Sequence, residues 1–384
     1  MKIALIHDYI ISYGGAEKTF KILSEIFPEA ELYTLFFDPS ILNKLKLGAS
    51  GDGREIKTSF LQKFPRFLRR KYQILLPLMP IAAETLDFRE FDIVISSSFS
   101  FTKGIITRPK TTHISYCHTP TRYLWDKSRK RFILHYFRVW DRQASERVDE
   151  FIASSKTVQD RIRKYYKRES TVIYPPVEIG NRQGITKLVS SNGYVERLTS
   201  NDTSVVTDKR KTGGEFYLIV SQLRKYKKID MAVDAFNKLG LELVIIGDGP
   251  EKIHLESMTK KNIKILGWQP EEITVEYYKN CTAFIFPGED DFGIAPVEAM
   301  SYGKPVLAYR KGGATETIIE GKTGEFFDYE NPAILADCVR RFRMKPANYY
   351  DSKFISEHAK KFSKERFKKE ILEFINKVAK SKQI

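Results

Sequence analysis

Apolar residues recur along the chain in two alternating patterns, short continuous runs and stripes at helical spacing. The run at 3–7 predicts a buried strand, which a turn at Gly14 and Gly15 follows. Phe20 and Phe27 then lie on one helical stripe before a proline ends the helix. A strand, a turn and a helix in this order form one unit of an α/β fold.

Further apolar runs rich in β-branched residues predict the other strands. They lie at 31–35, 92–95, 113–116 and 150–153 in the first half, and at 216–220, 242–246, 263–266, 282–286 and 305–308 in the second. Strands that alternate with helices pair in parallel, so the sequence predicts an α/β protein with two Rossmann-like domains.

The periodicity fails between residues 178 and 214, where Gly, Asn, Ser, Thr and Lys prevail. This composition predicts a linker or insert that is partly mobile. We therefore divide the chain into a first domain at 1–177, this linker at 178–214, a second domain at 215–357 and a C-terminal helix at 358–384.

The last helix has one apolar face. Phe367, Ile371, Phe374 and Val378 recur at helical spacing, and Ser363 is a candidate cap at its start. A stripe of this kind is expected to pack against another part of the protein.

Length and charge narrow the class of protein. The chain has 384 residues, too many for one ordinary core, and its 64 Lys and Arg outnumber 48 Asp and Glu, giving a net charge of +16. The excess favours anionic partners such as phosphorylated lipids, nucleotide diphosphates or nucleic acid, without choosing among them. Cys117, Cys281 and Cys338 lie far apart and form no CxxC pair, which fits a reducing cytosol.

Contact with a membrane is expected to be peripheral. The longest apolar run, at 74–83, has about ten residues, whereas about 20 are needed to span a bilayer, and the N-terminus lacks a secretion signal. Residues 57–72 interleave bases with aromatic side chains. Such a segment suits the surface of an anionic membrane, here the inner face of the cytoplasmic membrane. It equally suits RNA, or the outer face of an ordinary core helix.

The most specific constellation lies at 286–300. A strand ends, the acids Glu289, Asp290 and Asp291 fill a turn, and a helix begins near Ile294. Backbone amides at such a helix start can hold phosphate or sugar oxygens.

Glu298, about one turn inside this helix, can accept hydrogen bonds from two vicinal hydroxyls, the geometry that a ribose presents. Alternatively, the acids only cap and solvate the helix. They could also hold Mg²⁺, as acidic clusters often do.

Three other features follow predicted strands. Arg224 and Lys227 lie at the carboxyl edge of the second sheet, where α/β sheets bind ligands, and suit a diphosphate unless they are solvated surface cations. His118 can donate or accept a hydrogen bond near pH 7, although a lone His is more often structural. Gly14 and Gly15 allow close backbone approach to a ligand, or form only a tight turn. They lack the GxGxxG spacing of a dinucleotide site.

Together these residues resemble the retaining GT-B enzymes of glycosyltransferase family 4. The family carries an acid, seven residues and a Glu, with Phe-Gly after the first acid. The matching residues in this chain are Gly14, Gly15, Tyr116, Cys117, His118, Thr119, Pro120, Lys227, Asp290, Phe292, Gly293, Glu298, Ala299, Met300, Gly312 and Gly313. They occur in both halves of the chain and in the family's order.

The chain departs from the family at two positions. Asp290 stands where the family has Glu, with Glu289 beside it, and Gln222 stands where the family has an Arg that contacts the diphosphate. We expect Asp290 or Glu289 to act as the first acid, and Arg224 to replace the missing arginine.

The resemblance implies two Rossmann-like domains with parallel sheets facing across a cleft, with the acceptor bound by the first and the nucleotide sugar by the second. The last helix crosses back to the first domain. The catalytic residues implied are His118, Asp290 and Lys227, and the donor-binding residues are Gly14, Gly15, Arg224, Lys227, Glu289, Phe292, Gly293, Ile294 and Glu298. Neither a metal nor another cofactor is expected, because such enzymes neutralise the leaving diphosphate with cations and helix ends.

The resemblance also implies the reaction, transfer of a hexose from a nucleotide diphosphate to a glycan or lipid-linked acceptor in cell-surface polysaccharide synthesis. The Tyr-Cys-His-Thr-Pro run is similar to that of bacterial mannosyltransferases of polysaccharide and lipopolysaccharide assembly, which favours GDP-mannose; a UDP-hexose stays open. A nucleotide-sugar epimerase is the rival enzyme. A nucleic-acid-binding protein would explain the charge but not the 290–298 motif, so we expect no nucleic acid partner.

Overall fold

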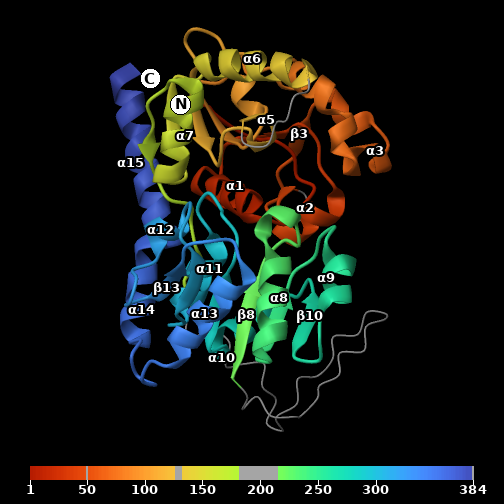
Figure 1. The fold of residues 1–384 in the computed structure, drawn as a ribbon. Helices are drawn as coiled ribbons and strands as arrows, with labels where there is room; N and C mark the ends of the chain where they lie inside the picture. Colours follow the sequence, from red (N-terminus) through yellow and green to blue (C-terminus); the bar gives the residue numbers. More distant parts are fainter. Residues whose placement is uncertain (49–50, 126–131, 181–214, 383–384) are drawn as a thin grey trace.

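The computed structural model describes residues 1–48, 51–125, 132–180 and 215–382, and contains two parallel β-sheets, each flanked by helices (Figure 1). Most of the predicted linker, at 181–214, lies outside the described residues. The prediction of an α/β protein with two Rossmann-like sheets is confirmed.

The first sheet has the strand order β3-β2-β1-β4-β5-β6-β7, and its neighbouring strands pair in parallel. Its strands are β1 (Ile3–His7), β2 (Glu31–Thr34), β3 (Ile56–Thr58), β4 (Ile93–Ser98), β5 (Thr112–Cys117), β6 (Glu150–Ala153) and β7 (Thr171–Val172). The helices of this part are α1 (Gly15–Ile26), α2 (Pro39–Leu45), α3 (Arg66–Arg70), α4 (Met79–Glu84), α5 (Arg122–Trp125), α6 (Phe132–Glu146) and α7 (Lys156–Tyr166).

The second sheet has the order β10-β9-β8-β11-β12-β13, again with parallel neighbours. Its strands are β8 (Phe216–Val220), β9 (Glu242–Ile246), β10 (Ile263–Gly267), β11 (Ala283–Phe286), β12 (Val306–Tyr309) and β13 (Gly324–Phe327). The helices are α8 (Ile229–Leu239), α9 (Lys252–Met258), α10 (Glu271–Asn280), α11 (Ile294–Ser301), α12 (Ala314–Thr317), α13 (Pro332–Arg343) and α14 (Ser352–Ala359).

The last helix, α15 (Lys364–Lys382), runs along the side of the molecule to the first domain (Figure 1). Ser363 caps it, because its hydroxyl accepts a hydrogen bond from the backbone N–H of Arg366 at 3.2 Å. Phe367 and Ile371 are buried in the same core as strands β1, β4 and β5, and Phe367 meets the ring of Tyr116 edge-on. The predicted stripe of this helix therefore belongs to the core of the first domain.

The segment at 57–83 is not one helix. The 3₁₀ turns Phe60–Lys63, Tyr72–Ile74 and Leu76–Leu78 alternate with α3 and α4, because prolines at 65, 77 and 80 interrupt any longer helix. Arg66 and Arg70 hold the segment against the carboxylate of Asp38, at 2.8 and 3.3 Å. The single core helix of that alternative is therefore not formed, although Leu61, Leu75 and Met79 of the segment are buried in a core and its arginines are exposed.

Candidate active site

The carboxyl ends of the two sheets meet at the interface between the domains. The turn after β1 touches the second domain so closely that a Cβ on Gly15 would lie 2.7 Å from Ile294, the first residue of α11. A Cβ on Gly14 would lie 3.1 Å from the side-chain amide of Gln222. The two glycines let this turn approach the second domain closely, and a side chain at either position would force a neighbouring side chain to shift.

Glu298 on α11 is bound from both domains. Its Oε1 lies 3.3 Å from the ammonium group of Lys18 on α1, and its Oε2 accepts a hydrogen bond of 2.9 Å from the hydroxyl of Tyr278 on α10. The charge of Glu298 holds the pKa of Lys18 above its ordinary value. The carboxylate is thus held in a fixed position at the interface, with its negative charge facing the first domain.

Lys227, in the 3₁₀ turn Lys225–Lys227 after β8, forms an ion pair with Asp290 in the loop after β11. Burial alone would lower the pKa of Lys227, but the charge of Asp290 outweighs it and the pKa lies above its ordinary value. Burial alone would raise the pKa of Asp290, but the charge of Lys227 outweighs burial and holds this pKa below its usual range. Both groups are therefore charged at neutral pH.

The remaining acids of the loop face arginines of the first domain. Arg161 on α7 pairs with Asp291 and, at 2.9 Å, with Glu289. Arg122 on α5 lies 3.6 Å from Asp291 and 4.0 Å from Asp290. The predicted acidic cluster is thus matched by cations from both domains.

Arg224 lies beside the position of the missing family arginine, since its Nε donates a hydrogen bond of 3.2 Å to the side-chain oxygen of Gln222. Gly293, which precedes α11, has a φ of +85°, a left-handed conformation that favours glycine. The side chain of Phe292 is buried against Tyr174 and Phe362, with ring centroids 5.6 Å away in each case, so its ring belongs to the core.

His118, just past β5, stays on the first-domain side of the interface. Its Nε2 lies 2.8 Å from the hydroxyl of Ser97, which in turn lies 3.0 Å from Nδ1 of the buried His7. Burial lowers the pKa of His118 to about 3, so the ring is neutral at pH 7. It can therefore donate or accept a hydrogen bond without carrying a charge.

Sequence reasoning missed a fully buried ion pair that supports this part of the site. The ammonium group of Lys103 lies 2.5 Å from a carboxylate oxygen of Asp141 on α6. Asp141 also accepts hydrogen bonds from Thr121 at 2.7 Å, Trp125 at 2.8 Å and Tyr166 at 2.9 Å. These bonds join α5, α6 and α7, which carry Arg122 and Arg161. No spacing in the sequence marks the pair, because its two members come from separate elements.

Two other acids with structural roles were not predicted. Asp8, fully buried after β1, accepts backbone hydrogen bonds from Phe99, Phe101 and Thr102 at 2.6 to 2.8 Å and so holds the loop after β4. Glu316 on α12 accepts hydrogen bonds from the backbone N–H groups of Lys156 and Thr157, at 2.8 and 2.9 Å, and thereby caps α7 of the other domain.

Glu17 is buried in the first turn of α1, next to the glycine turn. Its carboxylate accepts a hydrogen bond of 2.8 Å from Ser12. Burial raises its pKa to about 7, although hydrogen bonds, including that from Ser12, and the charge of Arg224 act in the opposite direction. This acid therefore titrates near neutral pH at the edge of the site.

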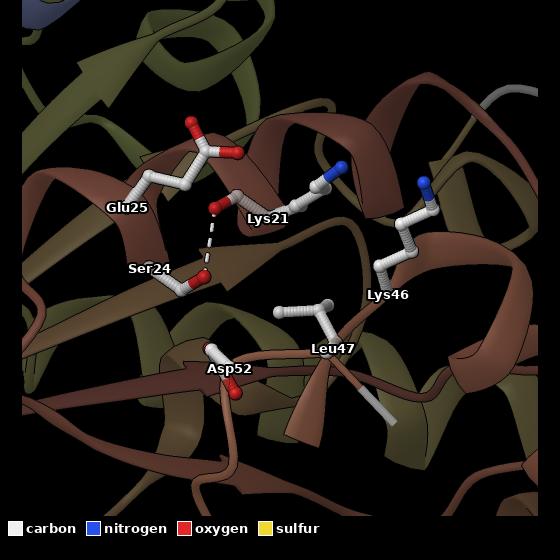
Figure 2. A pocket seen from close by; sticks show the side chains of 7 residues that line it. Lys21, Ser24, Glu25, Lys46, Leu47 and Asp52 are labelled. Atoms are coloured by element: carbon white, nitrogen blue, oxygen red, sulfur yellow. Dashed lines mark hydrogen bonds between the residues drawn. The ribbon is translucent and has the colours of Figure 1, made fainter. Parts of the chain in front are cut away.

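Within the described ranges, no three His, Cys, Asp or Glu side chains are grouped in a way that could hold a metal ion. None of the described helices has the length and hydrophobicity that a membrane span requires. A pocket of about 320 Å³ lies elsewhere on the first domain, where Lys21, Ser24, Glu25, Lys46, Leu47, Gly51 and Asp52 line it (Figure 2). It includes none of the predicted site residues.

Comparison with known proteins identifies two family models along the chain. The model of glycosyltransferase family 4 matches residues 14–180, and the model of glycosyl transferases group 1 matches residues 202–369. Between them they include every predicted site residue. The matches occupy the two halves of the chain that form the two sheets.

The chain is similar to an uncharacterized glycosyltransferase of Methanocaldococcus jannaschii, with 22% identity over 95% of this chain and 93% of the relative. It is 24% identical to the alpha-1,3/1,6-mannosyltransferase ALG2 of Dictyostelium discoideum, over 68% of this chain and 70% of the relative. Among solved structures it resembles Anabaena HepE in complex with UDP, at a TM-score of 0.67, 18% identity and coverage of 98% and 100%. The chain therefore belongs to the group 1 and family 4 glycosyltransferases, nucleotide-sugar-dependent enzymes with the GT-B fold.

Proposed function

We propose that the protein transfers mannose from GDP-mannose, with retention at the anomeric carbon, to a glycan or lipid-linked acceptor in cell-surface polysaccharide synthesis. The observation that carries the proposal is that the second domain directs Glu298 and the pair of Lys227 and Asp290 towards cations of the first domain, Lys18 and Arg122. These are the residue types that a ribose, a diphosphate and a hexose require, and they lie in the segments that follow strands β8 and β11 of one sheet.

Glu298 is proposed to bind the ribose. Tyr278 occupies only one of its carboxylate oxygens from within the same domain. The partner of the other oxygen, Lys18, comes from the first domain. A ribose hydroxyl can take the place of this ammonium group, because a carboxylate oxygen accepts from either donor.

Lys227 and Arg224, with the backbone amides at the start of α11, are proposed to hold the diphosphate. As the bond between the anomeric carbon and the phosphate oxygen breaks, these groups stabilise the developing charge. The acceptor hydroxyl forms the new bond on the same face of the sugar and gives its proton to the leaving phosphate. The hydrogen bond from Arg224 to Gln222 supports Arg224 as the substitute for the family arginine.

Asp290 is proposed as the first acid, which binds the hexose. Its carboxylate pairs with Lys227 in the same domain, whereas Glu289 is directed towards Arg161 of the other domain. His118 is proposed to bind a hydroxyl of the same sugar. We propose that no metal takes part, because the cations around the acidic loop already supply positive charge.

Mannose is proposed on two grounds, the Tyr116 to Pro120 run and the similarity to a mannosyltransferase. A UDP-hexose is the second candidate, since Anabaena HepE has been solved in complex with UDP.

The first domain is proposed to bring the enzyme to an anionic membrane on its cytoplasmic face, where a lipid-linked acceptor would lie. Large apolar side chains are exposed along the segment at 57–83, and Phe67, Ile74 and Ile81 are each more than half exposed, at 64%, 59% and 52%. Exposed side chains of Arg66 and Arg70 lie in the same segment. Apolar side chains flanked by bases suit the headgroup region of an anionic bilayer.

A thermal-shift panel of GDP, UDP, ADP and their sugars tests the donor, because a ligand that binds the native state raises its melting temperature. We expect GDP and GDP-mannose to give the largest increase. A larger increase of the melting temperature with UDP and a UDP-hexose would mean that the donor is a UDP-hexose, and the proposed transfer reaction would still hold. No increase with any nucleotide diphosphate would contradict the proposal.

A further inference from the structure

His118 lies at the end of a chain of three side chains that crosses the first sheet. Strands β1, β4 and β5 are neighbours, and their register pairs His7 with Ser97 and Ser97 with Tyr116. The hydroxyl of Ser97 consequently lies between two imidazoles, 3.0 Å from Nδ1 of His7 and 2.8 Å from Nε2 of His118. Both distances are those of hydrogen bonds.

The two imidazole rings are neutral, so the hydrogen bonds that join His7, Ser97 and His118 can run in only two ways. Burial lowers the pKa of His7, like that of His118, to about 3, so each ring carries one N–H at pH 7. The serine hydroxyl has a single hydrogen and can donate to only one of the rings. Either His7 donates to Ser97 and Ser97 to His118, or both bonds run in the opposite direction.

The surroundings of His7 favour the first arrangement. Its Nε2 is buried and has no hydrogen-bond partner among the described residues. The ring stacks on Phe20 at 5.1 Å and meets Phe99 edge-on at 5.6 Å, so two of its neighbours are apolar rings. The second arrangement would leave an unpaired N–H in this position, and orphaned buried N–H groups are rarer than bare acceptors.

We infer that Ser97, oriented by His7, is a positioning residue that holds His118 as the neutral tautomer with its proton on Nδ1. His118 then presents an N–H donor, and not a lone pair, to an oxygen of the donor sugar. The contact between His118 and the donor sugar rests on the proposed function, whereas the tautomer of His118 does not. A fixed donor of this kind would select a sugar oxygen that accepts, which is a contribution to the orientation of the hexose.

The sheet contains a matched control. Ser96 and His113 form a second buried serine–histidine pair on the same two strands, also at 2.8 Å. Neither residue belongs to the proposed site. Loss of the Ser96 hydroxyl therefore removes the same kind of bond without acting on His118.

The test is nitrogen NMR of the full-length protein labelled with ¹⁵N-histidine, which distinguishes a protonated from a bare ring nitrogen. His118→Gln assigns the signals. In the wild type without ligand we expect a protonated Nδ1 and a bare Nε2 for His118. In Ser97→Ala the two tautomers should mix, whereas Ser96→Ala should leave the signals of His118 unchanged. A protonated Nε2 in the wild type would overturn the inference, even if Ser97→Ala failed to fold.

Kinetics with GDP-mannose give the second readout. We expect Ser97→Ala to lower kcat/KM about tenfold, the effect of one hydrogen bond, and Ser97→Thr to restore most of it because the hydroxyl is kept. Equal values for Ser97→Ala and Ser96→Ala would contradict the role in sugar binding. If GDP-mannose and the UDP-sugars are not turned over at all, the proposed function fails, while the NMR result still decides the tautomer.

Discussion

At the residue scale, the proposed diphosphate site depends on Lys227, which forms an ion pair with Asp290. Lys227→Ala removes the cation nearest the first acid, so we predict a fall in kcat of about 100-fold, the effect of losing one preorganised donor to the leaving group. Steady-state kinetics with GDP-mannose measure it. Lys225→Ala, an exposed lysine of the same turn, should retain normal turnover, and near-normal kcat in Lys227→Ala would refute the assignment.

Glu17 should make stability depend on pH. Its pKa is about 7 in the folded protein and about 4.3 in an unfolded chain, so between these values the folded state holds a proton that the unfolded state has lost. Stability therefore falls as pH rises through this window. We predict that Glu17→Gln gains stability over the wild type at pH 8 but not at pH 4, by at most about 3.7 kcal/mol.

Urea denaturation of both proteins at the two pH values measures this difference. The exposed Glu29→Gln serves as the control and should show no such change. A constant difference between Glu17→Gln and the wild type across the range would mean that folding does not raise the pKa of Glu17.

The sequence marks the candidate residues of the site but not their partners. Lys227, Asp290 and Glu298 follow from the spacing of charges after strands and from the family resemblance. The pair of Lys18 and Glu298 does not, because its members lie 280 positions apart and meet only when the domains pack. The same holds for Arg161, whose helix carries no motif.

At the scale of elements, α15 is part of the first domain's core. Ile371 is 1% exposed and packs there, whereas the adjacent Leu372 is 42% exposed. We predict that Ile371→Ala costs about 2–5 kcal/mol of unfolding free energy and Leu372→Ala less than about 1 kcal/mol. Urea denaturation compares the two. Equal losses would mean that the helix does not pack as described.

The segment at 57–83 should determine membrane binding. We predict that the double variant Phe67→Ser, Ile74→Ser binds vesicles of anionic phosphatidylglycerol about tenfold more weakly, because two apolar side chains no longer enter the bilayer. Co-sedimentation measures the effect. Ile253→Ser with Met344→Ser, at two exposed apolar positions of the second domain, should bind like the wild type. Equal loss in both would show that the segment has no special role.

Strands were predictable where apolar runs are long and missed where they are short. The strands β1, β6, β8 and β9 have the predicted bounds. No prediction was made for β3, β7 and β13, which lie at the edges of the two sheets. Strands β3 and β7 have three and two residues, too few to show a period. Strand β13 begins with Gly324 and Glu325, so only its last two residues are apolar.

At the scale of the whole molecule, the sequence predicted two Rossmann-like sheets, but not the contacts between the domains that contain them. The glycine turn against Ile294, the cap that Glu316 provides for α7, and Lys44 over the ring of Trp268 at 4.0 Å all join distant parts of the chain. Such contacts depend on the relative position of the two sheets. No local pattern specifies that position.

The central claim is that this interface binds a nucleotide diphosphate sugar through Glu298. Isothermal titration calorimetry with GDP-mannose and UDP-glucose, on wild type, Glu298→Gln and the exposed Glu276→Gln of the same domain, tests it most directly. We predict that the wild type and Glu276→Gln bind one of the two nucleotide sugars with equal affinity. Glu298→Gln should bind it at least about tenfold more weakly, because a hydrogen bond from the ribose to a charged carboxylate is lost. Binding of neither sugar, or equal binding by Glu298→Gln, would contradict the claim.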